Sequence, residues 1–265
     1  MEINKIYNKD CIETMRECLE SHCVDVILTS PPYNMTKRKG GYADTGRYDV
    51  YEDWKTEQEY IDWIVDIFNG FDKVLKENGV VLFNINYSIE NPILPYKVIC
   101  EVDEHTSFTV VDTISWKKKY GLPFPANCRR LDRIWELVFV LTRKNEIDTF
   151  NTNIKVKSIA KTGQLYYETT YNFVEASNND GKCDLNQATY STDLCRKLLN
   201  IYARPGSVVY DPFSGTGTTS VAAKQMGLNY LGSEISSNQV EFSEKRLREI
   251  KSKDMVEDVF ENNLF

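Results

Sequence analysis

Histidine, paired cysteines and long apolar runs are all scarce in this sequence. It contains two histidines, and none of its seven cysteines forms a Cys-x-x-Cys pair, so we expect no zinc site. The odd number and the scatter of the cysteines predict reduced, mostly buried thiols. No apolar run approaches the roughly eighteen residues of a membrane helix, and the first residues lack the pattern of a signal peptide. These absences predict a cytoplasmic protein that does not contact membranes.

The charge of the chain is unevenly distributed. Hydrophobic residues make up 42% of the 265 positions, enough for the core of one large domain or of one domain with an insertion. The net charge is -7, yet residues 113–161 carry eleven lysines and arginines against four acids. A basic middle on an acidic body is compatible with nucleic-acid binding at one face, and a solvated surface is the simpler alternative.

Strands and helices alternate along most of the chain. Apolar β-branched runs predict strands over 3–7, 24–29, 80–85, 110–116, 134–142, 207–210 and 229–233. Helical spacing predicts helices over 10–20, 60–76, 191–202 and 238–250, and a further one that ends near Met226. The strands over 110–116 and 134–142 are expected to pair antiparallel. Residues 145–187 are rich in Asn, Thr and Tyr with weak periodicity, which predicts an insertion or a small recognition subdomain.

A glycine loop, residues 211–219, follows the predicted strand over 207–210. Gly215 and Gly217 let the backbone approach a ligand closely, and the helix after them points its free N–H groups toward that ligand. Glu234 lies at the end of the next strand, where its carboxylate can accept hydrogen bonds from both hydroxyls of a ribose. The pattern predicts a cofactor that contains adenosine.

The residues beside the two glycines bear on which cofactor this is. Ser220 supplies the third small residue of the dinucleotide pattern, so NAD remains an alternative. Asp211, Pro212 and Phe213 before the glycines are less usual for NAD, and an acid at the strand end can help to hold a charged amino-acid group. The loop therefore favours S-adenosylmethionine.

A second loop, Thr29-Ser30-Pro31-Pro32-Tyr33-Asn34, follows the predicted strand over 24–29. Its two prolines fix the backbone and remove two N–H donors. The Pro31 carbonyl and the Ser30 hydroxyl can then accept hydrogen bonds from one exocyclic amine while Tyr33 stacks on the ring that bears it. Accepting those protons frees the nitrogen lone pair to attack an electrophilic methyl group. A proline-stiffened turn with Tyr33 as filler is the alternative.

Together, these two loops resemble those of the DNA amino-methyltransferases, which use S-adenosylmethionine and carry an Asp/Asn/Ser-Pro-Pro-Tyr/Phe loop. The catalytic loop comes first and the cofactor loop last, an order similar to that of the permuted beta-type branch of this family. The serine at the start of the catalytic loop resembles that of the cytosine-N4 members of the branch. The resemblance implies an α/β fold, namely a Rossmann-like methyltransferase sheet that is circularly permuted and carries an inserted target-recognition region over 145–187. Residues 1–144, with the Ser-Pro-Pro-Tyr loop, and 188–265, with the cofactor loop, would form one domain.

The resemblance also carries over residue by residue. It implies catalytic contacts for Ser30, Pro31, Pro32 and Tyr33. It implies cofactor contacts for Asp10, Asp211, Phe213, Ser214, Gly215, Thr216, Gly217, Thr218 and Glu234. The chain departs from the family just before residue 191, where many relatives have a His-Pro pair and this sequence has Asn186-Gln187-Ala188-Thr189-Tyr190. In an open α/β sheet the strands over 24–28 and 207–210 would lie side by side at the topological switch point, which brings both loops into one crevice.

The first residue of the Ser-Pro-Pro-Tyr loop indicates which base is methylated. Family members with Ser at this position resemble cytosine-N4 methyltransferases and those with Asp resemble adenine-N6 enzymes, so Ser30 favours cytosine-N4 methylation. Adenine-N6 methylation remains an alternative because this correlation has exceptions. A serine is too weak a base to take the amine proton, so that proton would leave during or after transfer, to water. Cytosine-C5 methylation needs a cysteine nucleophile in a Pro-Cys pair, which the chain lacks. A protein-glutamine or RNA methyltransferase and a non-catalytic DNA-binding module are further alternatives.

Double-stranded DNA is the expected partner, with the target base flipped out of the duplex. Phosphate contacts supply most of the affinity in such complexes. The candidate cations are Lys37, Arg38, Lys39, Arg47, Lys117, Lys118, Lys119, Arg129, Arg130 and Arg133. Base readers are expected within 145–187. The sequence leaves open whether a cognate restriction endonuclease accompanies the protein, and whether it is a monomer or a homodimer.

Overall fold

A mixed sheet with helices on both faces forms the body of the protein. The computed structural model describes residues 1–34, 50, 55–87, 91–122, 129, 131–181, 183–186 and 188–256. The first half contains β1 (Lys5–Tyr7), α1 (Cys11–Glu17), β2 (Val24–Thr29), α2 (Glu57–Val74), β3 (Leu75–Ile85), α3 (Leu94–His105), β4 (Phe108–Leu122) and β5 (Arg133–Arg143). The second half contains β6 (Val156–Ile159), β7 (Leu165–Tyr167), β8 (Phe173–Ala176), α4 (Thr192–Tyr202), β9 (Val208–Asp211), α5 (Thr218–Gln225), β10 (Asn229–Ser233) and α6 (Ser237–Glu249).

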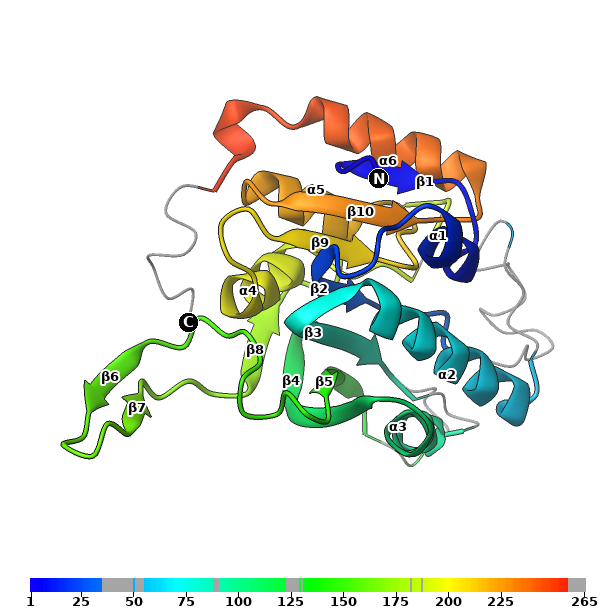
Figure 1. Ribbon diagram of the computed structural model, residues 1–265. Helices are drawn as coiled ribbons and strands as arrows, with labels where there is room; N and C mark the ends of the chain where they lie inside the picture. Colours follow the sequence, from blue (N-terminus) through cyan, green and yellow to red (C-terminus); the bar gives the residue numbers. More distant parts are fainter. Residues whose placement is uncertain are drawn as a thin grey trace.

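The strand order of the main sheet is β1-β10-β9-β2-β3-β5-β4-β8 (Figure 1). Strands β1, β10, β9, β2 and β3 are parallel, whereas β5 runs antiparallel to both of its neighbours. The predicted antiparallel pairing of the strands now seen as β4 and β5 is confirmed. Strand β8 closes the far edge parallel to β4. This arrangement confirms the expected fold class.

Alternating side chains of the central strands fill two separate cores. Val26 and Leu28 of β2 point to the face covered by α4, α5 and α6. Ile27, between them, points to the face covered by α1, α2 and α3. Because successive residues of a strand face opposite sides, a strand buried on both faces is apolar at nearly every position. The run from Val24 to Leu28 has this character.

Strands β2 and β9 are hydrogen-bonded neighbours, with Val26 opposite Val209 and Ile27 opposite Tyr210. The helix after β2, α2, covers one face of the sheet, and the helix after β9, α5, covers the other. The two chain directions therefore diverge between these strands, which is the definition of a topological switch point. The loops at residues 29–34 and 211–219 leave the sheet side by side, as expected.

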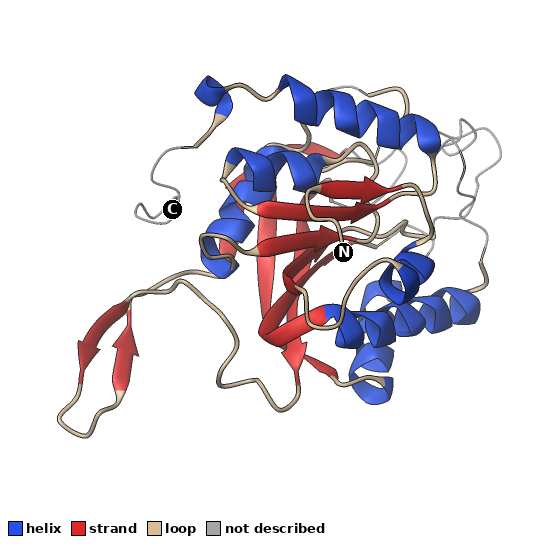
Figure 2. Cartoon of the chain, turned by 45° about the horizontal axis from the view of Figure 1, so that its top comes forward, coloured by secondary structure: helices blue, strands red, loops and turns tan. Residues whose placement is uncertain are grey.

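Four elements, α3, β6, β7 and β8, were not predicted from the sequence. Helix α3 was not predicted, because Pro95 and a short apolar pattern hide a helix in which proline occupies the first turn. Within residues 145–187, β8 joins the main sheet, whereas β6 and β7 form a separate hairpin that projects from the body (Figures 1 and 2). Among the described residues, no helix combines the length and the apolar character that crossing a bilayer would require.

The aromatic cluster under α2 predicts where the fold is most sensitive to mutation. Phe68 is fully buried, with ring centroids 4.9 Å from Phe71, 5.3 Å from Phe83 and 5.6 Å from Phe108. We expect Phe68→Ala to lower the free energy of unfolding by about 3–5 kcal/mol, since it leaves a cavity between helix and sheet. Chemical denaturation measures this change. Tyr171→Ala, at a side chain that is 78% exposed, is the control and should leave stability within about 0.5 kcal/mol.

Candidate active site

A pocket opens at the carboxyl edge of the sheet, where β2, β9 and β10 end. Most of the residues predicted to bind cofactor line it, together with part of the Ser-Pro-Pro-Tyr loop. The predicted residues in its wall are Asp10, Ser30, Pro32, Asp211, Phe213, Ser214, Gly215, Thr216, Thr218 and Glu234. Pro31, Tyr33 and Gly217 are not among the residues that line it. Both loops thus border one cavity despite their separation in the chain.

The carboxylate of Asp211 joins the two loops. Thr29 Oγ1 donates to its Oδ1 at 2.7 Å, and the Phe213 N–H donates to the same atom at 3.0 Å. Thr219 Oγ1 and Tyr190 OH donate to Oδ2 at 2.7 and 3.1 Å. Burial raises the pKa of Asp211, and these hydrogen bonds oppose that rise. Because all of the bonds come from within the protein, the carboxylate holds the end of β2 against the start of the glycine loop.

Glu234 fixes the other side of the glycine loop. Its Oε2 accepts a hydrogen bond from the Gly215 N–H at 2.8 Å, and its Oε1 accepts one from the Ser236 N–H at 2.9 Å. Its own N–H donates to the Tyr7 carbonyl at 3.0 Å, which ties β10 to β1. Binding of a ribose at this position stays a prediction.

Position 217 requires glycine for two reasons, its backbone conformation and the lack of space for a side chain. It is the N-cap of α5 with φ +77°, a left-handed conformation that side chains disfavour. A Cβ at this position would lie 2.8 Å from the Cβ of Ser243 on α6. Ser243 Oγ in turn donates to the Gly215 carbonyl at 2.9 Å. The glycine loop is therefore held between β10 and α6.

Asp10 enters the pocket wall as the N-cap of α1. Its Oδ1 accepts hydrogen bonds from the N–H groups of Ile12 at 2.8 Å and Glu13 at 3.4 Å. Capping fixes the orientation of this carboxylate. The structure thus brings Asp10 into the wall of the same pocket as Glu234, which is distant in sequence.

Helix α2 adds pocket residues that sequence reasoning missed. Trp63 lines the pocket with its ring centroid 5.4 Å from that of Phe213, and the Lys55 ammonium lies 5.4 Å from the Trp63 ring. Tyr60 OH donates to the Pro32 carbonyl at 2.7 Å and anchors the catalytic loop. Trp63 and Tyr60 follow the apolar spacing of α2, so the sequence presents them as ordinary core residues.

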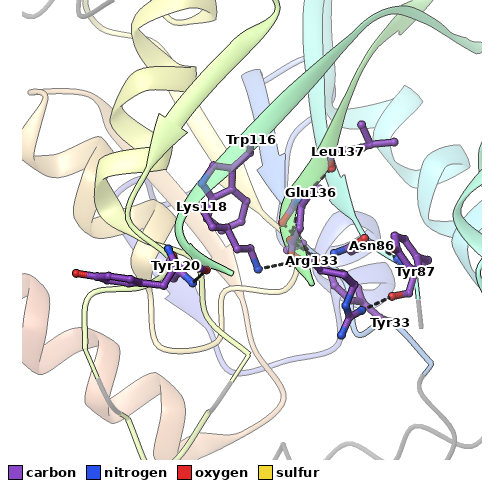
Figure 3. Close-up of polar contacts among 12 residues, drawn as sticks. Tyr33, Asn86, Tyr87, Trp116, Lys118, Tyr120, Arg133, Glu136 and Leu137 are labelled. Atoms are coloured by element: carbon purple, nitrogen blue, oxygen red, sulfur yellow. Dashed lines mark hydrogen bonds and ion pairs between the residues drawn. The ribbon is translucent and has the colours of Figure 1, made fainter. Parts of the chain in front are cut away.

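The predicted catalytic loop ends in a polar network. Ser30 Oγ donates to Tyr33 OH at 3.0 Å, and Tyr33 OH contacts Asn84 Oδ1 at 3.1 Å and Glu136 Oε2 at 3.3 Å. Glu136 forms a buried ion pair with Lys118 of β4 (Figure 3). Sequence reasoning missed Asn84 and Glu136, since only the pairing of β3 with β5 brings them to this loop. Stacking of Tyr33 on a base stays a prediction.

Among the cations predicted to contact DNA, some are buried or paired with other residues and others are exposed. Lys37, Arg38, Lys39, Arg47 and Arg130 lie outside the described residues. Lys118 is buried against Glu136, and Lys117 pairs with Glu175 at 2.7 Å. Arg133 donates to the Tyr87 carbonyl at 2.9 Å, and its guanidinium lies 5.5 Å from the Tyr87 ring (Figure 3). Lys119 and Arg129 are exposed.

The segment that lacks the family's His-Pro pair also reaches the pocket. Asn186 lines it, and its Nδ2 donates to Gln239 Oε1 at 3.0 Å. Tyr190 hydrogen-bonds to Asp211, as described above. No group of three or more potential metal ligands occurs in the part of the chain that the structure describes.

Comparison with known proteins gives a consistent set of similarities. The family model N6_N4_Mtase, described as DNA methylase, matches residues 24–245. The Type II methyltransferase M.HinfI of Haemophilus influenzae is 25% identical over 264 residues, which cover 94% of this chain and 69% of that protein. The DNA adenine methyltransferase YhdJ of Escherichia coli (strain K12) is 24% identical, with 93% of this chain and 83% of the relative covered.

Solved structures show the same fold. The PvuII DNA methyltransferase (cytosine-N4-specific) superposes with a TM-score of 0.70 at 18% identity, covering 97% of this chain and 90% of that one. The M1.HpyAVI–SAM complex superposes with a TM-score of 0.60 at 22% identity, covering 92% of this chain and 98% of that one.

The geometry of Gly217 predicts the effect of adding one methyl group. We expect Gly217→Ala to weaken binding of S-adenosylmethionine roughly tenfold or more, because the loop must move away from Ser243. Isothermal titration calorimetry measures the dissociation constant. Gly227→Ala is the matched control, since Gly227 also has a positive φ, +68°, but no atom lies within 4 Å of the added Cβ. Equal affinities in the two variants would contradict this account of the loop.

Proposed function

This chain belongs to the N6_N4_Mtase family of DNA methylases, and from that premise we propose that it is a site-specific DNA methyltransferase acting on the N4 amine of a flipped cytosine. The observation that carries the proposal is the adjacency of β2 and β9, which brings the Ser-Pro-Pro-Tyr loop and the glycine loop to one pocket. A methyl donor and an amine must meet within bonding distance for transfer, and two loops at one switch point allow this.

The pocket residues fit S-adenosylmethionine. When bound, this cofactor supplies an electrophilic methyl group on a sulfonium. The carboxylates of Asp10 and Glu234 suit hydroxyl or ammonium groups, and the rings of Trp63 and Phe213 offer apolar faces for a purine. We assign cofactor binding to these groups and to Ser214, Thr216 and Thr218 of the same wall.

The catalytic loop would act on the amine. Ser30 Oγ and the Pro31 carbonyl accept hydrogen bonds from the two amine protons, which keeps the nitrogen lone pair directed at the methyl group. Pro32 is held by Tyr60, so the loop keeps its shape without a substrate. We assign to Tyr33 the support of Ser30 through its hydroxyl and contact with the base through its ring.

DNA would lie across the same edge of the sheet. Lys119 and Arg129 present exposed charges beyond the catalytic loop, at the far ends of β4 and β5. The basic residues of 37–47 follow the catalytic loop directly in the chain. Such cations supply affinity through phosphates rather than sequence preference. The β6–β7 hairpin and its neighbours are the proposed base-reading region.

Adenine-N6 methylation is the second candidate, because one relative is named as a DNA adenine methyltransferase. Ser30 favours cytosine, as does the similarity to a structure named as cytosine-N4-specific. The choice of base therefore depends mainly on one side chain. Both bases present an exocyclic amine, so the pocket chemistry above applies to either.

The modified base itself decides between the two candidates. We expect DNA from cells that express the protein to contain 4-methylcytosine, because Ser30 occupies the first position of the loop. Nuclease digestion followed by mass spectrometry of the nucleosides measures it, with DNA from cells expressing Ser30→Ala as the background. Appearance of 6-methyladenine would establish the second candidate, and absence of both would refute a DNA amino-methyltransferase.

Removal of the Ser30 hydroxyl separates chemistry from cofactor binding. We expect Ser30→Ala to lower kcat on the order of a hundredfold, since one acceptor that acts at the amine is lost. The affinity for S-adenosylmethionine should stay within about twofold, because the glycine loop is unchanged. Transfer of a labelled methyl group and calorimetry measure the two quantities. Ser21→Ala, at an exposed serine before the amino end of β2 and outside the pocket wall, is the control.

A further inference from the structure

We propose that Glu136 is a positioning residue that sets the direction of the hydrogen bonds at the catalytic loop, and so keeps Ser30 Oγ an acceptor toward the pocket. The inference rests on the proposed function, since it concerns how that site receives an amine. It also assigns a role to Lys118, which sequence reasoning placed among the DNA-contacting cations and the structure places inside the protein.

Four strands contribute to this network. Ser30 and Tyr33 follow β2, Asn84 lies on β3, Glu136 on β5 and Lys118 on β4. Asn84, Glu136 and Lys118 are 1%, 7% and 8% exposed, so water does not compete for most of their bonds. Figure 3 shows Lys118 and Glu136 directed toward each other, with Tyr33 nearby. Buried polar groups of this kind are stable when each donor faces an acceptor and each acceptor faces a donor.

The groups at the two ends of the network, the Leu137 carbonyl and the Lys118 ammonium, determine the direction in which each hydrogen bond is donated. The Leu137 carbonyl can only accept, so Asn84 Nδ2 donates to it at 2.9 Å and Asn84 Oδ1 faces Tyr33. The Lys118 ammonium can only donate, and it donates to Glu136 Oε1. Two of the oxygens that contact Tyr33 OH, Asn84 Oδ1 and Glu136 Oε2, are therefore acceptors.

Tyr33 must then donate its single proton to one of these acceptors. Its oxygen accepts the hydrogen bond from Ser30 Oγ, 3.0 Å away. Ser30 also has a single proton, and this bond uses it. The lone pairs of Ser30 Oγ are left for the pocket, where an exocyclic amine offers donors. A ring carbonyl at the same position would meet an acceptor, so the network selects bases that carry an amine.

The ion pair keeps this direction from reversing. A neutral amide in place of the Glu136 carboxylate could donate to Tyr33, and then Tyr33 could donate to Ser30. Ser30 would point its proton into the pocket and repel the amine. Lys118 is itself held by the Trp116 ring, whose centroid lies 4.9 Å from Nζ. The pairing of β4 with β5, which brings Lys118 to Glu136, thus fixes the direction in which the Ser30 hydroxyl donates its proton. Ser30 follows β2, which lies three strands from β4 in the sheet.

A double-mutant cycle between Glu136 and Tyr33 tests the inference. We expect Glu136→Gln to lower kcat roughly tenfold while the affinity for S-adenosylmethionine changes less than about twofold. In a Tyr33→Phe background the same substitution should have no further effect, because the hydroxyl that transmits it is gone. The substrate is unmethylated plasmid DNA on which the wild-type protein is active.

A second buried acid provides the matched control. Glu146 is also 7% exposed and contacts Arg143, at the opposite end of β5. Glu146→Gln should lower the thermal midpoint without changing kcat. If Glu136→Gln does not fold because Lys118 loses its partner, the pair Lys118→Met with Glu136→Gln replaces it, and the same fall in kcat is expected.

Two outcomes would overturn the inference. Wild-type kcat in the Glu136 variant means that the carboxylate does not direct the network. An equal loss of kcat with and without the Tyr33 hydroxyl means that Glu136 acts by another route. A wild-type protein that transfers no methyl group to DNA is a different result, which refutes the proposed function itself.

Discussion

The buried carboxylate of Asp211 is the interaction on which the rest of the site depends. It accepts hydrogen bonds from the end of β2, from the glycine loop, from α5 and from the segment before α4. An ionised group at this depth is costly unless it is fully hydrogen-bonded. The four donors therefore have to remain in place together, and the two functional loops remain together with them. Two further hydrogen bonds hold the same loops: Glu234 accepts from the glycine loop, and Tyr60 donates to the catalytic loop.

The parts of the site that could be predicted are those in which local chemistry is unusual. Pro31 and Pro32 after an apolar run, and glycines before a helix, indicate loops at strand ends whatever the rest of the chain does. The adjacency of β2 and β9 followed from the fold class that these loops implied. Strand and helix positions followed from apolar periodicity, with errors of a few residues at their ends.

The residues that were missed carry no local signal. Trp63 and Tyr60 lie on the apolar stripe of α2, and nothing in that stripe distinguishes a side chain that reaches a pocket. Asn84 and Glu136 are 52 residues apart and meet only because β3 and β5 pair in one register. Lys118 belongs to a run of three lysines that suggests a surface, yet alternation along β4 turns it inward. Register between distant strands is a tertiary property, and single residues do not encode it.

The order of strands in the sheet has a consequence for biosynthesis. Strands β1 and β2 are synthesised before β9 and β10, yet β1 pairs with β10 and β2 pairs with β9. A nascent chain that ends before β9 exposes the edge of β2 and has no glycine loop. The pocket is therefore completed only when the final strands insert between two that were made at the start. A polypeptide that lacks β9 and β10 therefore lacks the cofactor loop and one side of the pocket.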